Sequence, residues 1–83
     1  MDIDSEVQEI FRGTISFLSP EGIVIVRELM SHDELHLAIE YICDQLVENC
    51  VHIPYELGTK IQKVSESMGL DPERTWASLT VSK

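Results

Sequence analysis

The sequence has few basic residues, few aromatic residues and no long apolar run. Six Lys and Arg stand against 15 Asp and Glu, which gives a formal net charge of −9. Such a charge disfavours binding to phosphate backbones and anionic lipid, and it favours encounter with cationic surfaces. No apolar stretch approaches the length that spans a bilayer. We therefore expect neither direct binding of nucleic acid nor insertion into a membrane.

The N-terminal stretch, MDIDSEVQEI, also lacks the features of a secretory signal. It begins with acidic residues and has no basic leader and no sustained apolar segment. The only two cysteines, Cys43 and Cys50, fall on one predicted helix. About 10.5 Å of helical rise separates them, which is beyond the reach of a disulfide. An acidic start and two reduced thiols together favour a cytoplasmic protein.

The sequence does have helical periodicity. A chain of 83 residues with 43% hydrophobic content predicts a single domain with one modest core. Apolar residues recur at helical spacing in three segments, at about residues 5–18, 31–50 and 54–68, and a further helix is expected over about residues 20–30. We therefore expect an all-α fold, a single-domain bundle of four helices over residues 1–83. Its core should lie within about residues 5–77, and the tail at 78–83 should fray.

One run in the second segment is ambiguous. Ile23-Val24-Ile25-Val26 is β-branched throughout, which is typical of a buried strand. A helix is favoured because Ser19-Pro20-Glu21, a cap residue followed by proline and an acid, precedes the run. The sequence also offers no second strand that could pair with it.

Other boundaries carry signals of their own. Asp4 or Ser5 should cap the first helix. Gly69 should end the fourth helix as a left-handed cap. Asp71-Pro72-Glu73 should open a short helical turn through Trp76, whose indole should fold onto the core.

The third segment, SHDELHLAIEYICDQLVENC, organises the chain. It should begin at Ser31 or His32. Its core stripe repeats at i, i+4, i+7 and i+11: Leu35, Ile39, Ile42, Leu46. The opposite side gathers carboxylates within roughly 80° of arc, with two large side chains in or beside them: Asp33, Leu37, Glu40, Tyr41, Asp44, Glu48. Carboxylates one turn apart repel, so this face is either solvated or kept for a basic partner. In the first case Leu37 and Tyr41 belong to a widened core stripe.

Two patterns suggest chemistry, and both are incomplete. His32-Asp33-Glu34-Leu35-His36 approaches the zinc-protease motif HExxH, but an aspartate stands where that motif has its glutamate base. Cys43 or Cys50 with His52 lacks a third group that would orient the base, and acidic surroundings raise the pKa of a thiol. We therefore expect no catalytic residue, no metal site and no cofactor.

Several short pieces occur in a recognisable order. They are Leu18-Ser19-Pro20-Glu21, Val26-Arg27-Glu28-Leu29, Leu37-Ala38-Ile39-Glu40, Cys43-Asp44-Gln45-Leu46, Ile53-Pro54 and Met68-Gly69-Leu70-Asp71. This order, over roughly residues 18–76, resembles that of bacterial immunity proteins of the MafI type. The resemblance implies a small helical protein encoded beside a polymorphic secreted toxin. Such a protein protects the producing cell by binding the C-terminal domain of the toxin.

The resemblance and the acidic face together predict stoichiometric binding without catalysis. The expected partner is the basic C-terminal domain of a cognate toxin, a ribonuclease or deoxyribonuclease, because an enzyme that grips nucleic acid presents a basic cleft. Tyr41 is expected at the centre of the contact, with the four carboxylates opposite Lys or Arg. The alternative is a small helical adaptor or regulatory subunit that binds a partner helix through an apolar groove. Self-association is left open.

Overall fold

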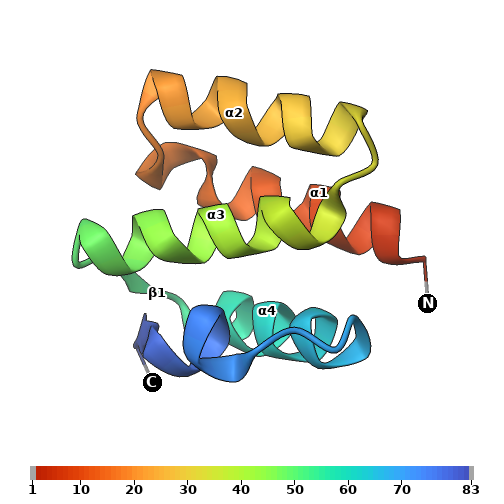
Figure 1. The fold of residues 1–83 in the computed structure, drawn as a ribbon. Coiled ribbons are helices and arrows are strands. Elements are labelled where there is room, and N and C mark those ends of the chain that lie inside the picture. The colour runs from red at the N-terminus through yellow and green to blue at the C-terminus, as the bar shows by residue number, and fades with distance from the viewer. Residues whose placement is uncertain (1, 83) are drawn as a thin grey trace.

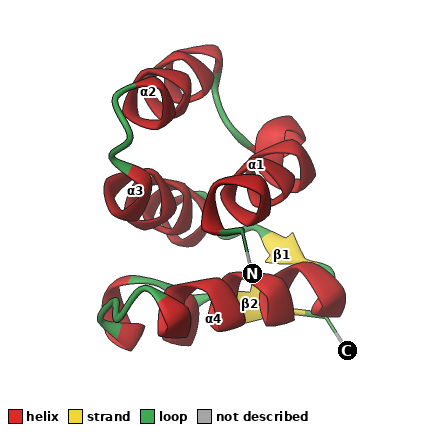
Figure 2. Cartoon of the chain, turned by 90° about the vertical axis from the view of Figure 1, so that its right-hand side faces the viewer, coloured by secondary structure: helices red, strands yellow, loops and turns green. Residues whose placement is uncertain are grey.

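Four α-helices in three layers dominate the computed structural model, which describes residues 2–82 (Figure 1). The helices are α1 (Ile3–Thr14), α2 (Pro20–Ser31), α3 (Leu35–Glu48) and α4 (Tyr55–Ser67). Figure 2 shows α1 and α3 side by side in the middle layer, with α2 on one side and α4 on the other. The expected all-α class is confirmed, and the run 23–26 lies inside α2 as a helix.

Short elements complete the chain. Three 3-10 turns occur in the described part: η1 (Ile15–Phe17), η2 (Pro72–Arg74) and η3 (Trp76–Ser78). The turn expected after Asp71 is therefore 3-10 in type, and the Asp71 side chain accepts a hydrogen bond from the Glu73 N–H, at 3.0 Å. Trp76 is half-buried and packs against the core, as expected.

The C-terminal tail differs from the expectation that it frays. Strand β1 (His52–Ile53) pairs in parallel with β2 (Thr80–Val81), and the Ser82 N–H donates to the Ile53 carbonyl at 2.8 Å. The Val81 side chain is half-buried and packs against the core. Strands of two residues are too short to show an alternating pattern, so periodicity does not predict them. Met1 and Lys83, the ends of the expected domain and tail, lie outside the described residues.

The core is built from the inward-facing stripes of α1, α3 and α4. Val7, Ile10, Phe11, Thr14 and Leu18 are all buried, and the Thr14 hydroxyl donates to the Ile10 carbonyl at 2.9 Å. The third-helix stripe is also buried, apart from half-buried Leu35 at its start. From α4, Ile61 and Val64 enter the same cluster.

Three helices end in the same way. The residue after the C-cap has a positive φ in α2 (Asp33, 58°), in α3 (Cys50, 53°) and in α4 (Gly69, 70°). In each case the N–H of the next residue donates, at 2.9 Å, to a carbonyl five residues earlier, as in a Schellman motif. Gly69 is thus the left-handed cap that the sequence predicted, whereas Asp33 and Cys50 hold the same conformation at a steric cost.

The predicted starts of two helices are wrong. α2 continues to Ser31, and the turn through Asp33 then reverses the chain, so α3 begins at Leu35 instead of Ser31 or His32. Aspartate tolerates the left-handed conformation, so this turn occurs without the glycine that would have indicated it in the sequence. α1 begins at Ile3, so its cap residue is Asp2 instead of Asp4 or Ser5.

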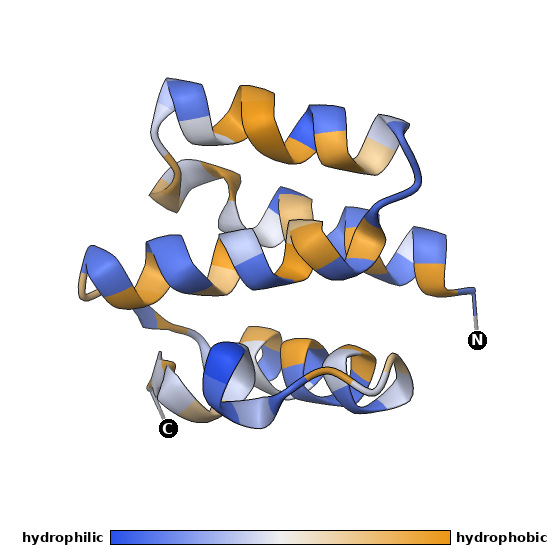
Figure 3. Ribbon diagram, viewed as in Figure 1, coloured by the Kyte–Doolittle hydropathy of each residue, from blue (hydrophilic) through white to orange (hydrophobic). Residues whose placement is uncertain are grey.

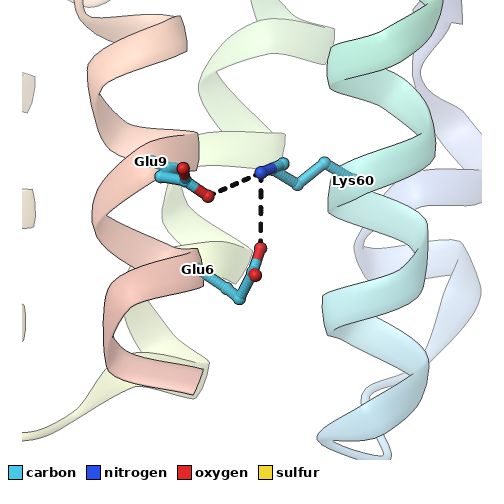
Figure 4. Close-up of polar contacts among 3 residues, drawn as sticks. All are labelled: Glu6, Glu9 and Lys60. Atoms are coloured by element: carbon cyan, nitrogen blue, oxygen red, sulfur yellow. Dashed lines mark hydrogen bonds and ion pairs between the residues drawn. The ribbon is translucent and has the colours of Figure 1, made fainter. Parts of the chain in front are cut away.

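One cation joins the lower two layers. Lys60 Nζ on α4 lies 2.6 Å from Glu9 Oε2 and 3.4 Å from Glu6 Oε2 on α1 (Figure 4). The hydrogen bond to Lys60 lowers the pKa of Glu9, and the same bond raises the pKa of Lys60. Any stability from Glu9 is therefore present above the ordinary pKa of glutamate and is lost as the pH falls through the lowered value. Because the pair is exposed, its contribution is small.

The contact between Gly58 and the C-terminal strand gives a first prediction. A Cβ on Gly58 would lie 2.8 Å from Val81 Cγ2, inside van der Waals contact. Gly58→Ala should therefore lower the free energy of unfolding by about 1 kcal/mol, because overpacking outweighs the gain in helix propensity. In a Val81→Ala background the same change should be neutral or stabilising. Urea unfolding of the four proteins checks this, and equal effects in both backgrounds would contradict the contact.

Cys50, the left-handed residue after α3, gives a second prediction. Cys50→Gly should raise the free energy of unfolding by about 1 kcal/mol, because glycine adopts a positive φ without a Cβ clash. Asn49→Gly is the matched control, since Asn49 has φ −90°. That change should lower stability, by up to about 1 kcal/mol. Urea midpoints that move in the same direction for both variants would show that Cys50 carries no strain.

Candidate functional site

α3 presents one exposed face, on its side away from α1. In Figure 1, α3 lies in front of α1, with α2 above it and the η2–η3 segment below, and Figure 2 shows the same order from the side. The buried stripe of α3 turns toward the core, so the residues opposite that stripe face the solvent between α2 and η2. We call this surface the α3 face, defined by five residues of the helix: Leu37, Glu40, Tyr41, Asp44, Glu48.

The sixth residue expected here, Asp33, lies elsewhere. It is exposed in the turn between α2 and α3, at the left-handed position that ends α2. Because Asp33 is not part of α3, the helical spacing that would place it beside Glu40 does not hold. The structure brings the other three carboxylates together but leaves Asp33 beyond the start of the helix.

The carboxylates of the α3 face form a row without counterions. Glu40, Asp44 and Glu48 follow one another at one-turn spacing over about 12 Å of helix axis. Asp44 and Glu48 are exposed and Glu40 is half-buried. Among residues 2–82, none of the three lies within 4.0 Å of a Lys or Arg nitrogen, whereas Glu6 and Glu9 on α1 share Lys60. The row therefore carries a mutual repulsion that a bound cation would relieve.

The sequence explains why these charges are unpaired. Between Arg27 and Lys60 the chain contains seven acidic residues and no Lys or Arg. They are Glu28, Asp33, Glu34, Glu40, Asp44, Glu48 and Glu56. Two of the flanking cations are engaged elsewhere: Arg27 lies over the Phe11 ring at 5.9 Å, and Lys60 binds α1. No local cation is available to the α3 face from its own stretch of chain.

The two large side chains of the face differ in their surroundings. Leu37 is 39% exposed, outside the core cluster. Tyr41 is half-buried and packs against that cluster, and its hydroxyl would lie 3.6 Å from a Cβ on Gly22. Tyr41 thus leans on the first turn of α2 as a boundary residue, and Leu37 is the more available of the two for contact with a partner.

Two shallow hollows adjoin along the α3 face. The first, of about 260 Å³, lies where α3 meets α2 and is lined by Leu29, Leu37, Glu40, Tyr41, Asp44 and Arg74. The second, of about 330 Å³, lies where α3 meets the η2–η3 segment, and its lining includes Asp44, Glu48, Glu73 and Arg74. Asp44 and Arg74 line both hollows. The face is therefore a trough, more apolar near α2 and more polar near η2.

Sequence reasoning missed Glu73 and Arg74. Both come from η2, which packs against α3 although it is distant in sequence. The Asp71-Pro72-Glu73 signal predicted the turn, but no periodicity indicates where a single turn docks. Arg74 is the one cation that lines either hollow, and it has no carboxylate within 4.0 Å among residues 2–82. It reduces the negative charge that a partner meets.

The two histidines of the HExxH-like pattern lie apart, and Cys43 is buried. His32 is the C-cap of α2 and His36 lies in α3, so the two do not share a helix face. Within residues 2–82 no three His, Cys, Asp or Glu are grouped to hold a metal ion. Burial, with smaller effects of Asp44 and Glu40, raises the pKa of the Cys43 thiol to about 12. Cys43 is therefore protonated at neutral pH.

Comparison with other proteins adds no relative. No family model, no curated protein and no solved structure matches the chain. The resemblance to immunity proteins of the MafI type is thus an expectation from short sequence pieces. Among residues 2–82, no helix has the length and apolar character to span a membrane.

The thiols give a third prediction. In the native protein a thiol reagent at neutral pH should modify Cys50 rapidly and Cys43 very slowly, because Cys50 is exposed and Cys43 is buried with a raised pKa. In denaturant both should react at the same rate. Reagent titration with mass spectrometry distinguishes the two sites, and Cys50→Ser is the control. Rapid native modification of Cys43 would mean that the contact between α3 and η2 opens readily.

Proposed function

We propose that this protein is an immunity protein that neutralises a cognate toxin domain by stoichiometric binding through the α3 face. The observation that carries the proposal is the row of unpaired carboxylates beside the exposed Leu37 and the half-buried Tyr41. A surface of this kind has an unfavourable self-energy that a cationic partner removes on contact. A partner that binds nucleic acid supplies such a cationic surface.

The charged and apolar residues of the α3 face are expected to contribute differently to binding. The net charge of −9 steers a basic partner toward the protein and speeds association. Affinity depends more on the apolar contacts at the centre, where Leu37 and the edge of Tyr41 lose water. The protein would act as a cover over the cleft of the toxin, in place of its nucleic acid, and would carry out no reaction itself.

The sequence resemblance supports the choice of a toxin as the partner. Two of its pieces, Leu37-Ala38-Ile39-Glu40 and Cys43-Asp44-Gln45-Leu46, lie in α3 and include residues of the α3 face. Their other members, such as Ile39 and Leu46, are buried. The pieces thus bear on the packing of α3 as much as on its surface.

Charge reversal tests the proposal. The probe is the recombinant C-terminal domain of the secreted protein encoded beside this gene, with affinity measured by calorimetry. Asp44→Lys should weaken binding at least about tenfold, or 1.4 kcal/mol, because Asp44 lines both hollows. Arg74→Gln should strengthen it, since one repelling cation is removed. Glu66→Lys, an exposed change of equal charge on α4, is the matched control and should have little effect.

Two results would count against the face. Equal losses for Asp44→Lys and Glu66→Lys would mean that net charge alone matters. Absence of binding by the unchanged protein would remove the proposed function altogether.

Ionic strength separates this proposal from a helical adaptor. Binding through the α3 face should weaken steeply as salt is added, because exposed charges are screened beyond about 10 Å at 0.1 M. Binding of a partner helix through an apolar groove alone should hardly change. A salt series on the same complex therefore distinguishes the two functions.

A further inference from the structure

The apolar surface of the molecule continues from the α3 face onto α2. Leu29 of α2 lines the first hollow together with Leu37 and Tyr41. Ile25 lies one turn before Leu29 on the same side of α2 and is 39% exposed. Figure 3 shows a broad hydrophobic band in the middle of α2. We call the strip formed by Ile25, Leu29 and Leu37 the α2–α3 seam.

The fold itself does not require this exposure. α2 packs mainly on α3, and its fully buried residues are Gly22 and Val26. Ile25 sits in a β-branched run, and isoleucine at an exposed helical position has a lower propensity than alanine. Ile25 therefore adds exposed apolar surface beside Leu29, and this surface is available for contact with a partner.

The charges beside the seam indicate which partner fits. On the α3 side the seam is bordered by the carboxylates of Glu40 and Asp44, with the Arg74 guanidinium beyond them, so the surface is apolar along one edge and carries a net negative charge along the other. A second copy of this chain would bring the same carboxylates and a net charge of −9 against each other. An amphipathic helix with Lys or Arg along one edge of its apolar stripe complements both edges of the seam.

We infer that the partner inserts such a cationic amphipathic helix along the α2–α3 seam, with its apolar side chains on Ile25, Leu29 and Leu37 and its cations over the α3 row. The inference rests on the proposed function, because it names the element by which the toxin domain binds. One-turn spacing on the seam, from Ile25 to Leu29, matches the i, i+4 spacing of side chains on a helix that lies in a groove.

Two neighbouring residues of α2 provide the test. Ile25 and Val24 are both β-branched and exposed, and both line an open hollow on α2 with Pro20 and Glu21. Val24, at 58% exposure, lies about 100° farther around the helix from Leu29 than Ile25 does, so it is the more distant of the two from the seam. Ile25→Ser should weaken binding of the recombinant toxin domain at least about tenfold, and Val24→Ser should change it by less than about threefold. Serine has nearly the same helix propensity as either residue, so both variants should fold. Leu37→Ser, on the other side of the seam, should match Ile25→Ser.

The outcomes distinguish the inference from the function beneath it. Loss of binding with Asp44→Lys but not with Ile25→Ser would overturn the seam and leave the proposed function standing. Equal losses for Val24→Ser and Ile25→Ser would place the partner over the outer side of α2 and also overturn it. Sedimentation of the protein alone should show a monomer, and a dimer that Ile25→Ser abolishes would assign the seam to a second copy.

Discussion

The burial of one side of α3 fixes the direction of every charge on its other side. Ala38, Ile39, Ile42, Cys43 and Leu46 are buried against the surrounding helices, so the helix cannot rotate without exposing them. The row from Glu40 to Glu48 is consequently held at one-turn spacing on the solvent side. A flexible acidic segment of the same composition would have to lose conformational entropy on binding, whereas this row has lost it during folding.

The layers above and below α3 turn that row into a shaped surface. α2 supplies the apolar border through Leu29, and η2 supplies the polar border through Glu73 and Arg74. On the opposite side of the molecule, Glu6 and Glu9 of α1 share Lys60 of α4, so these carboxylates have a counterion at the contact between the two helices. The two acidic clusters therefore differ in role: one joins α1 to α4, and the other has no counterion among residues 2–82.

The helices and most of the α3 face could be predicted from the sequence, because apolar and acidic residues repeat at helical spacing along the chain. The 3.6-residue period located α1, α3 and α4 and their buried stripes. The Ser19-Pro20-Glu21 signal gave the start of α2, where Ser19 Oγ accepts from the Gly22 N–H at 3.0 Å. The same period placed three of the four carboxylates on the α3 face. Asp33 was misplaced because a non-glycine residue adopts the left-handed conformation there, and no local pattern announces it. Arg74 and the pairing of β1 with β2 depend on contacts between distant segments, which periodicity does not encode.

A solution NMR footprint measures most directly whether a basic partner binds on the α3 face. The ¹⁵N-labelled protein would be titrated with the unlabelled domain of the proposed toxin while the amide resonances are followed. We expect the resonances of residues 37–48 on α3, together with those of Ile25, Leu29 and Arg74, to shift or broaden at stoichiometric addition. Shifts confined to α1 and α4, with α3 unchanged, would contradict this expectation.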